Sequence, residues 1–226
     1  MRAERAIDGD TLSLADGREL RLIGISAPKS TPKGPLYPVA EAARSELDRL
    51  AAGRTLTLYV GGRASDRRHR LLAHAVAEDG IWLQGAMLAA GLARVETFAD
   101  NRSRAGEMLA LEAAAREARR GIWAEPRFRV LTPKQAERWR DGYHLVEGRV
   151  LRVSEEKGRI ALEFSPDGKR GFVLAIPSRQ RALFRTAGID PGGLTGATLR
   201  VRGWIHRWIG PEILASHPEQ IERIRQ

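Results

Sequence analysis

The chain has 226 residues, enough for one large domain or for two small domains that each bury a modest hydrophobic core. It contains no cysteine, which excludes disulfides, zinc–thiolate sites and cysteine nucleophiles. Its net charge of +10, from 38 Lys and Arg against 28 Asp and Glu, favours a polyanionic partner such as DNA or RNA over an arginine-rich but merely solvated surface.

The positive charge is unevenly distributed along the chain. Residues 1–126 hold 19 basic and 17 acidic groups, a net of +2, whereas residues 127–226 hold 19 and 11, a net of +8. We therefore expect the second half to carry much of the nucleic-acid affinity. No apolar run approaches the ~20 residues that span a bilayer, so we expect no membrane partner. The compartment stays open: cytoplasmic on the sequence as given, or exported if an N-terminal signal was removed.

The first half shows strand patterns broken by turns, and then helices. Asp8-Gly9 and Asp16-Gly17 favour tight hairpins because glycine accepts positive φ, and they divide residues 3–25 into strands. Residues 39–52 repeat apolar side chains at spacings of four, four and three, which predicts a helix ended by Gly53. The other predicted elements are a loop at 28–38, a strand at 55–60, a basic loop at 63–70, a strand at 71–76 and helices at 81–90 and 104–120.

The helix at 104–120 has the clearest boundary signals. Ser103 is its expected N-cap, because a serine hydroxyl can accept a hydrogen bond from an otherwise unpaired amide of the first turn. Gly121 is its expected end. The expected buried face consists of Met108, Leu111, Ala115 and Ala118.

The second half predicts a small barrel. After a linker at 126–142, strands are expected at 144–153, 159–164, 171–176, 198–205, 212–215 and 219–224, with a helix at 179–187. Three strands, a helix and two strands are the order of a five-stranded OB-type barrel. We therefore expect an OB-like C-terminal domain at 143–226, after a first domain at 1–125.

Three segments of the first half could carry chemistry. Asp8 and Asp10 flank a glycine, and two carboxylates at this spacing could bind a hard cation, although Asp-Gly-Asp also occurs in plain turns. Arg21, within an apolar strand, could clamp a phosphate or face solvent. The run Asp66–Arg70 is strongly basic and is either a phosphate-binding or a solvated loop.

Together these segments resemble the staphylococcal nuclease family. Ile7-Asp8-Gly9-Asp10-Thr11-Leu12 and then Arg21-Leu22-Ile23-Gly24-Ile25-Ser26-Ala27-Pro28 are similar to its Val-Asp-Gly-Asp-Thr and Arg-Leu-x-Gly-Ile-Asp-Ala-Pro-Glu motifs. Asp66–Arg70 resembles its Asp-x-Tyr-Gly-Arg element, and Gly91-Leu92-Ala93 and Gly121-Ile122-Trp123 also match. The resemblance covers about 120 residues. It implies an α+β, mainly β fold, in which an OB barrel carries three helices.

The resemblance also implies a mechanism and assigns residues to it. In that family, carboxylates hold a calcium ion, a glutamate activates the attacking water, and two arginines stabilise the charge that develops on the phosphate. Asp10 matches the first metal ligand, and Arg21 and Arg70 match the two phosphate-stabilising arginines. Arg67 and Arg68 lie in the basic loop, where we expect contacts with nucleic acid.

Two departures fall at the centre of this machinery. Ser26 replaces the second metal aspartate, and Lys29 replaces the catalytic glutamate. A hydroxyl is a poor substitute for a charged calcium ligand, and an ammonium group has no lone pair for metal or proton. We predict that Lys29 fills the vacated metal site and pairs with Asp10; the rival prediction is that Lys29 points into solvent. His69, another departure, could serve as a general base.

The second half has candidates of its own, in and after the strand at 198–205. Aromatic rings interleaved with arginines suit stacking on bases and contact with phosphates, although a core tryptophan among solvated arginines would show the same pattern. The residues concerned are Arg200, Arg202, Trp204, Arg207 and Trp208. Three motifs resemble a C-terminal module of some bacterial thermonuclease-like proteins: Gly203-Trp204-Ile205, Gly210-Pro211-Glu212-Ile213 and His217-Pro218-Glu219-Gln220-Ile221. His217, beside Pro218, is expected to be structural.

We therefore expect a monomeric nucleic-acid-binding protein whose nuclease centre is degenerate, with no cofactor. Two alternatives stay open: a working calcium-dependent nuclease with unusual ligands, and a scaffold for protein interactions. The sequence does not decide between DNA and RNA.

Overall fold

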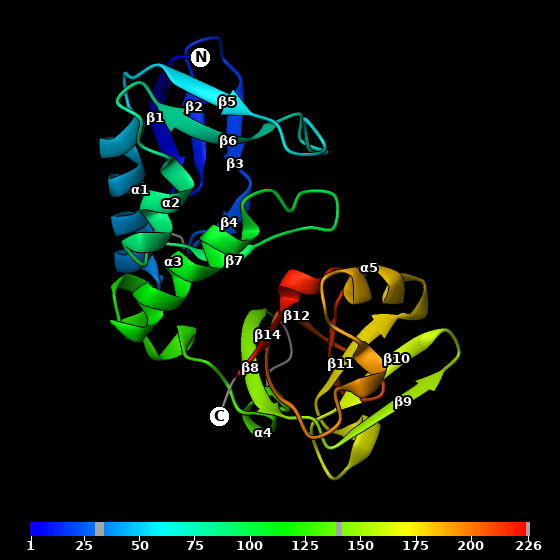
Figure 1. Ribbon diagram of the computed structural model, residues 1–226. Helices are drawn as coiled ribbons and strands as arrows, with labels where there is room; N and C mark the ends of the chain where they lie inside the picture. Colours follow the sequence, from blue (N-terminus) through cyan, green and yellow to red (C-terminus); the bar gives the residue numbers. More distant parts are fainter. Residues whose placement is uncertain (30–33, 139–141, 225–226) are drawn as a thin grey trace. The chain divides into compact units, whose positions relative to one another are not determined.

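The computed structural model describes residues 1–29, 34–138 and 142–224, and the chain divides into two units, residues 1–128 and 129–226. The strands and helices of each unit are drawn in Figure 1. None of the helices in the described part of the chain is long and apolar enough to cross a membrane.

Five strands form the barrel of the first unit. They pair in the order β1–β2–β3–β6–β5, and a bridge between Arg2 and Thr55 brings the path back to the start of β1. The third and fifth of these strands along the chain, β3 and β6, are parallel, and the other pairs are antiparallel. Their bounds are β1 Ala3–Asp8, β2 Thr11–Leu14, β3 Glu19–Leu22, β5 Leu56–Tyr59 and β6 Leu71–Ala77.

Three helices lie beside this barrel, as expected: α1 (Tyr37–Ala51), α2 (Leu83–Ala89) and α3 (Ala105–Glu117) (Figure 1). Helix α1 buries one apolar face against the strands, and the chain leaves it through Gly53, whose φ of +74° suits glycine. The apolar side chains between helices and strands make the core of this unit. Its large, fully buried members include Leu12, Leu14, Leu20, Leu22, Ile25, Leu47, Leu56, Leu83, Met87, Leu88 and Met108.

Helix α3 differs from expectation at its start and on its buried face. Its N-cap is Arg104, in a left-handed conformation and without a side-chain capping bond, so Ser103 does not cap the helix. Ala118 is exposed, and Glu112 is fully buried instead. Polar contacts explain the burial of Glu112: its Oε1 accepts a hydrogen bond from the Val95 amide at 2.8 Å, and its Oε2 pairs with Arg116 at 3.2 Å.

A pair of short strands, β4 (Gly24–Ser26) and β7 (Arg94–Glu96), runs antiparallel outside the barrel path. Strand β7 was not predicted, because three residues are too few to show a period. Glu112 links β7 to α3, and β4 leads directly into Ala27. The pair therefore connects the helices to the segment that carries the Ser26 and Lys29 departures.

The second unit is a second barrel with the same ring of pairings. Its strands pair in the order β9–β10–β11–β13–β12, and β12 returns to β8, which precedes β9 in the chain. Counted along the chain from β9, the third and fifth strands, β11 and β13, are again the parallel pair. This is the OB-type order that was predicted. The elements are β8 Tyr143–Arg149, β9 Arg152–Glu156, β10 Arg159–Glu163, β11 Val173–Pro177, α5 Arg181–Thr186, β12 Thr198–Arg207, β13 Pro211–Leu214 and β14 Ile221–Arg223.

Much of the stretch expected as a linker is folded. Residues 129–138 belong to the second unit and contain the short helix α4 (Pro133–Ala136), capped by the Thr132 hydroxyl. Leu131 and Ala136 are buried in the core of the second barrel. Residues 139–141 of the expected linker lie outside the described residues. Short 3-10 turns occupy Gly121–Ala124, Pro126–Phe128, Gly168–Arg170, Ser178–Gln180, Pro191–Gly193 and Pro218–Gln220.

A buried histidine should make the stability of the first unit depend on pH. His74 Nδ1 accepts a hydrogen bond from the Trp82 indole at 3.2 Å, so the ring proton sits on Nε2, which donates to the Ser103 carbonyl at 3.1 Å. Burial lowers the pKa of His74 below its ordinary 6.5. Because the unfolded chain then binds the proton more tightly than the folded one, the free energy of unfolding should fall as the pH drops below about 6.5.

Urea denaturation of the wild-type chain and of His74→Gln at pH 7.5 and pH 5.5 checks this prediction. A glutamine amide can both accept from Trp82 and donate to Ser103 but does not titrate, so the variant should lose less stability between the two pH values. An equal loss in both proteins would contradict the prediction.

Candidate functional site

Asp10 is a carboxylate without any solvent exposure, held at the turn between β1 and β2. Its Oδ2 accepts a hydrogen bond from the Ala27 amide at 2.7 Å, and its Oδ1 accepts one from the Thr11 hydroxyl at 3.1 Å. The turn is pressed against its surroundings at Gly9, where a Cβ would lie 2.6 Å from the Cβ atoms of both Ala27 and Ala43. Glycine between the two aspartates therefore lets the turn approach α1 and the end of β4.

Two cations reach the same carboxylate. Lys29 Nζ lies 2.7 Å from Asp10 Oδ1 and 2.5 Å from Asp8 Oδ2, so its ammonium group bridges the two aspartates. Arg21 Nε lies 3.3 Å from Asp10 Oδ1. The predicted pairing of Lys29 with Asp10 is confirmed, and the rival prediction that Lys29 points away into solvent is wrong. The Lys29 side chain is nevertheless half exposed. The contact of Lys29 with Asp8 was not predicted. The Asp-Gly-Asp motif, which brings a second carboxylate close to Asp10, was the one sequence feature that could have indicated it.

Burial and charge oppose one another at these carboxylates. Burial raises the pKa of Asp10, while the positive charges of Arg21 and Lys29 act in the opposite direction. Burial also acts to raise the pKa of Asp8, but the hydrogen bond and charge of Lys29 outweigh it and hold this pKa below its ordinary value. Without Lys29, two neighbouring carboxylates would face each other with a single arginine nearby, which is costly for groups removed from water.

Arg21 is fixed by the backbone as well as by Asp10. Its Nη1 donates to the Leu22 carbonyl at 2.5 Å, and its Nη2 donates to the Ile25 carbonyl at 2.8 Å. These bonds hold the guanidinium group between the end of β3 and strand β4. Arg21 also lines a pocket, so this residue connects the buried aspartate to an open surface.

That surface, here called the arginine pocket, has a volume of about 530 Å³. Arg21, Arg67 and Arg70 all line it, so the structure brings three of the predicted phosphate-contacting residues together. Its lining also includes Arg63, the first residue of the predicted basic loop, and four residues without a sequence signal: Glu96, Phe98, Asp100 and Asn101. Asp10 and Lys29 do not line it.

The arginines of the pocket differ in how they are held. Arg70 Nε and Nη2 lie 2.8 and 2.7 Å from Asp66 Oδ2, which fixes the guanidinium group. Arg67 is exposed and makes no ion pair within the described residues. Arg68 and His69 are exposed in the same loop but do not line the pocket. His69 has a left-handed backbone with φ of +61°.

A calcium site of the expected kind does not match these residues. The Lys29 ammonium occupies the space between Asp8 and Asp10, Ser26 brings no charge, and the described residues contain no group of three or more His, Asp or Glu side chains able to hold a metal. An ion at Asp10 would have to displace a cation that is part of the chain.

The candidates of the second unit are mostly engaged with protein groups. Arg200 donates to Glu147 at 2.6 Å and to Glu222, and Arg202, only 1% exposed, also pairs with Glu222. Their placement across sheet pairs argues against the expected contact with nucleic acid. Arg207 donates to the Glu137 carbonyl at 3.0 Å.

The two tryptophans of this region are placed differently from the arginines. Trp204 is half exposed, with its ring edge-on to Tyr143, and Trp208 is 76% exposed. His217 is buried with Nδ1 3.0 Å from the Ser216 hydroxyl, in keeping with a structural role.

The first unit thus joins an OB-type barrel, three helices, a buried aspartate and a pocket with two fixed arginines, the architecture of a nuclease-like domain. A family model of staphylococcal nuclease homologues matches residues 19–125, and the first unit therefore holds a domain of that family. The match begins after the turn that carries Asp8 and Asp10 and leaves the second unit uncovered. No curated protein matches the chain.

Removing the charge of Lys29 should loosen this site. We expect Lys29→Met to lower the free energy of local opening by about 1 kcal/mol, a modest value because the lysine is half exposed and screened by solvent. Native-state hydrogen exchange of the Ala27 amide measures this opening directly, since that amide donates to Asp10. Lys134→Met, which changes an exposed lysine of the other unit, is the matched control and should leave the exchange unchanged. Equal exchange in wild type and Lys29→Met would refute the expected role.

Proposed function

We propose that this protein binds nucleic acid through a nuclease-type domain that hydrolyses phosphodiesters poorly or not at all. The family of the first unit comprises nucleic-acid-binding proteins and nucleases that generally depend on calcium. The observation that carries the proposal is the Lys29 ammonium between Asp8 and Asp10, at 2.5 and 2.7 Å. The positive charge of this ammonium group neutralises the carboxylates that would otherwise attract a calcium ion.

The chemistry of the remaining groups supports the loss of hydrolysis. Activation of water needs a group that can accept a proton, and a lysine ammonium held by two carboxylates cannot do so. Asp10 is fully buried and its oxygens already accept several hydrogen bonds. His69 does not line the arginine pocket, so it is not placed to act as a general base there.

The binding part of the proposal rests on what the site retains. Arg21 and Arg70 are held by neighbouring groups, and Arg67 is exposed beside them, so the pocket offers oriented guanidinium groups to a phosphate. The net charge of +8 over residues 127–226 adds long-range attraction for a polyanion. A calcium-dependent nuclease would use the same arginines, and the test below separates the two functions.

The proposal predicts that two substitutions restore the missing chemistry. Ser26→Asp with Lys29→Glu removes the tethered cation and supplies two carboxylates beside Asp10, whose Oδ2 already contacts the residue after Ser26. We expect the double variant to gain calcium binding in calorimetry and calcium-dependent, EDTA-sensitive hydrolysis of DNA or RNA, while the wild type shows neither.

The matched control adds Asp10→Ala to the double variant and should abolish both gains. Efficient calcium-dependent hydrolysis by the wild-type protein, lost on Asp10→Ala, would overturn the proposal in favour of a working nuclease. Lack of nucleic-acid binding at low salt would favour a protein-interaction scaffold, because phosphate binding is strongest there.

A further inference from the structure

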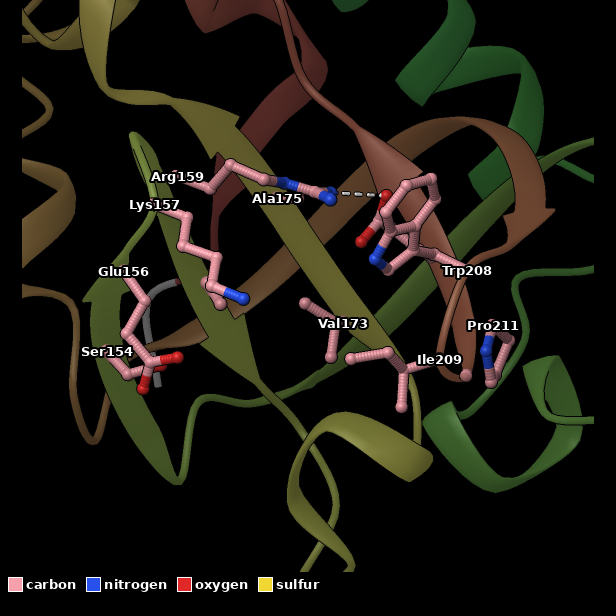
Figure 2. Close-up of a pocket in the computed structure, with 12 residues that line it drawn as sticks. Ser154, Glu156, Lys157, Arg159, Val173, Ala175, Trp208, Ile209 and Pro211 are labelled. Atoms are coloured by element: carbon pink, nitrogen blue, oxygen red, sulfur yellow. Dashed lines mark ion pairs between the residues drawn. The ribbon is translucent and has the colours of Figure 1, made fainter.

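The second barrel carries a hollow of about 420 Å³ that the proposed function leaves unused. Its lining comes from β9, β10 and β11 and from the turn between β12 and β13. Figure 2 shows Glu156 and Lys157 on one side of it and Trp208 and Ile209 on the other, with Val173 between them. We call it the Trp208 hollow.

The hollow follows from the side chains on the outer face of the sheet. Ser154, Ala161 and Ala175 are direct neighbours across β9, β10 and β11, so three small side chains form a row. The residues that alternate with them, such as Leu162 and Leu174, are buried in the barrel core. A floor of small side chains leaves space in which a flat ring can approach the sheet.

The sides of the hollow are large and exposed. Trp208 and Ile209, at the β12–β13 turn, are 76% and 62% exposed. The Arg159 guanidinium lies 5.8 Å from the Trp208 ring centre and pairs with Glu212 at 2.5 Å, an ion pair drawn in Figure 2. Glu212 therefore neutralises Arg159, whose guanidinium group lies over the Trp208 ring.

Lys157 provides a cation on the opposite side. It makes no ion pair within the described residues and lies in the β9–β10 hairpin turn with φ of +51°, followed by Gly158 at +74°. Such turns favour Asn, Asp or Gly at the first of these positions, so a lysine there carries a local backbone cost. The hairpin places this positive group across the hollow from an exposed aromatic ring.

We infer that the Trp208 hollow is a subsite for one unpaired base of single-stranded nucleic acid, stacked on Trp208 with its phosphate near Lys157. This inference rests on the proposed nucleic-acid binding. An exposed indole over an apolar floor suits the face of a base, and the cation suits the adjoining phosphate. A double helix keeps its base faces stacked inside and cannot offer one. The net charge of +8 over residues 127–226 selects a polyanion over an uncharged ring compound.

Binding of a fluorescent twelve-residue oligothymidylate to the full chain, followed by anisotropy, tests the subsite. We expect Trp208→Ala to weaken binding on the order of 10-fold without changing the dependence of affinity on salt, whereas Trp208→Phe keeps most of the affinity. Lys157→Met should reduce the slope of log affinity against log salt by about 0.7, the value for one phosphate contact on a single strand. Ala161→Leu fills the floor and should weaken binding as Trp208→Ala does.

The controls separate this subsite from general binding. Tyr59→Ala removes an exposed aromatic side chain of the first unit that lines neither pocket and should leave the affinity unchanged. A twelve-base-pair duplex should bind wild type and Trp208→Ala equally.

Three results would overturn the inference. If wild type binds the oligonucleotide and Trp208→Ala binds it equally well, the subsite is refuted, a protein partner becomes the better occupant, and the proposed function stands. Equal losses on single strand and duplex would also refute it, because they would exclude stacking on an unpaired base. If wild type binds neither probe at low salt, the subsite and the proposed function fall together.

Discussion

The buried carboxylate of Asp10 is the charge that the rest of the first unit has to accommodate. A carboxylate without solvent contact is stable only when donors and cations surround it, and here four such groups come from three segments of the chain. Thr11 belongs to β2, Arg21 to β3, Ala27 follows β4, and Lys29 extends from the segment beyond it. The convergence explains the close approach at Gly9 and the presence of the short β4–β7 pair, which holds the end of β4 in reach.

The two barrels share one ring of strand pairings but offer different surfaces to a ligand. In the first unit the arginine pocket lies beside β3 and β4 and is lined by guanidinium groups that neighbouring carboxylates and carbonyls orient. In the second unit Arg200 and Arg202 form ion pairs with glutamates. The open surface there is the Trp208 hollow, an apolar floor beside an indole ring. One fold thus carries two surfaces of different chemistry. Function follows from the side chains at each surface and not from the topology.

The resemblance to the staphylococcal nuclease family predicted the first barrel, and the order of three strands, a helix and two strands predicted the second. The resemblance also predicted the meeting of Lys29 and Asp10, since motif matches placed them at one site. Sequence patterns did not predict features that depend on tertiary contacts. Glu112 is buried because it serves the β7 backbone, and no period reveals such a partner. Arg202 is enclosed by the pairing of β12 with β8 and β14, although an arginine beside tryptophans reads as a binding residue. The three-residue strand β7 carries no pattern at all.

The left-handed turn at Lys157 and Gly158 has a consequence for the history of the second unit. A residue with positive φ at this point is easiest to supply as glycine or asparagine, and either would close the same hairpin at lower cost in backbone energy. Without selection on its side chain, Lys157 would therefore tend to be replaced by glycine or asparagine, and the barrel would stay intact. Its persistence among related chains would have to be maintained by selection on the side chain, so the residue found at this turn in distant relatives would record which of them kept a ligand here.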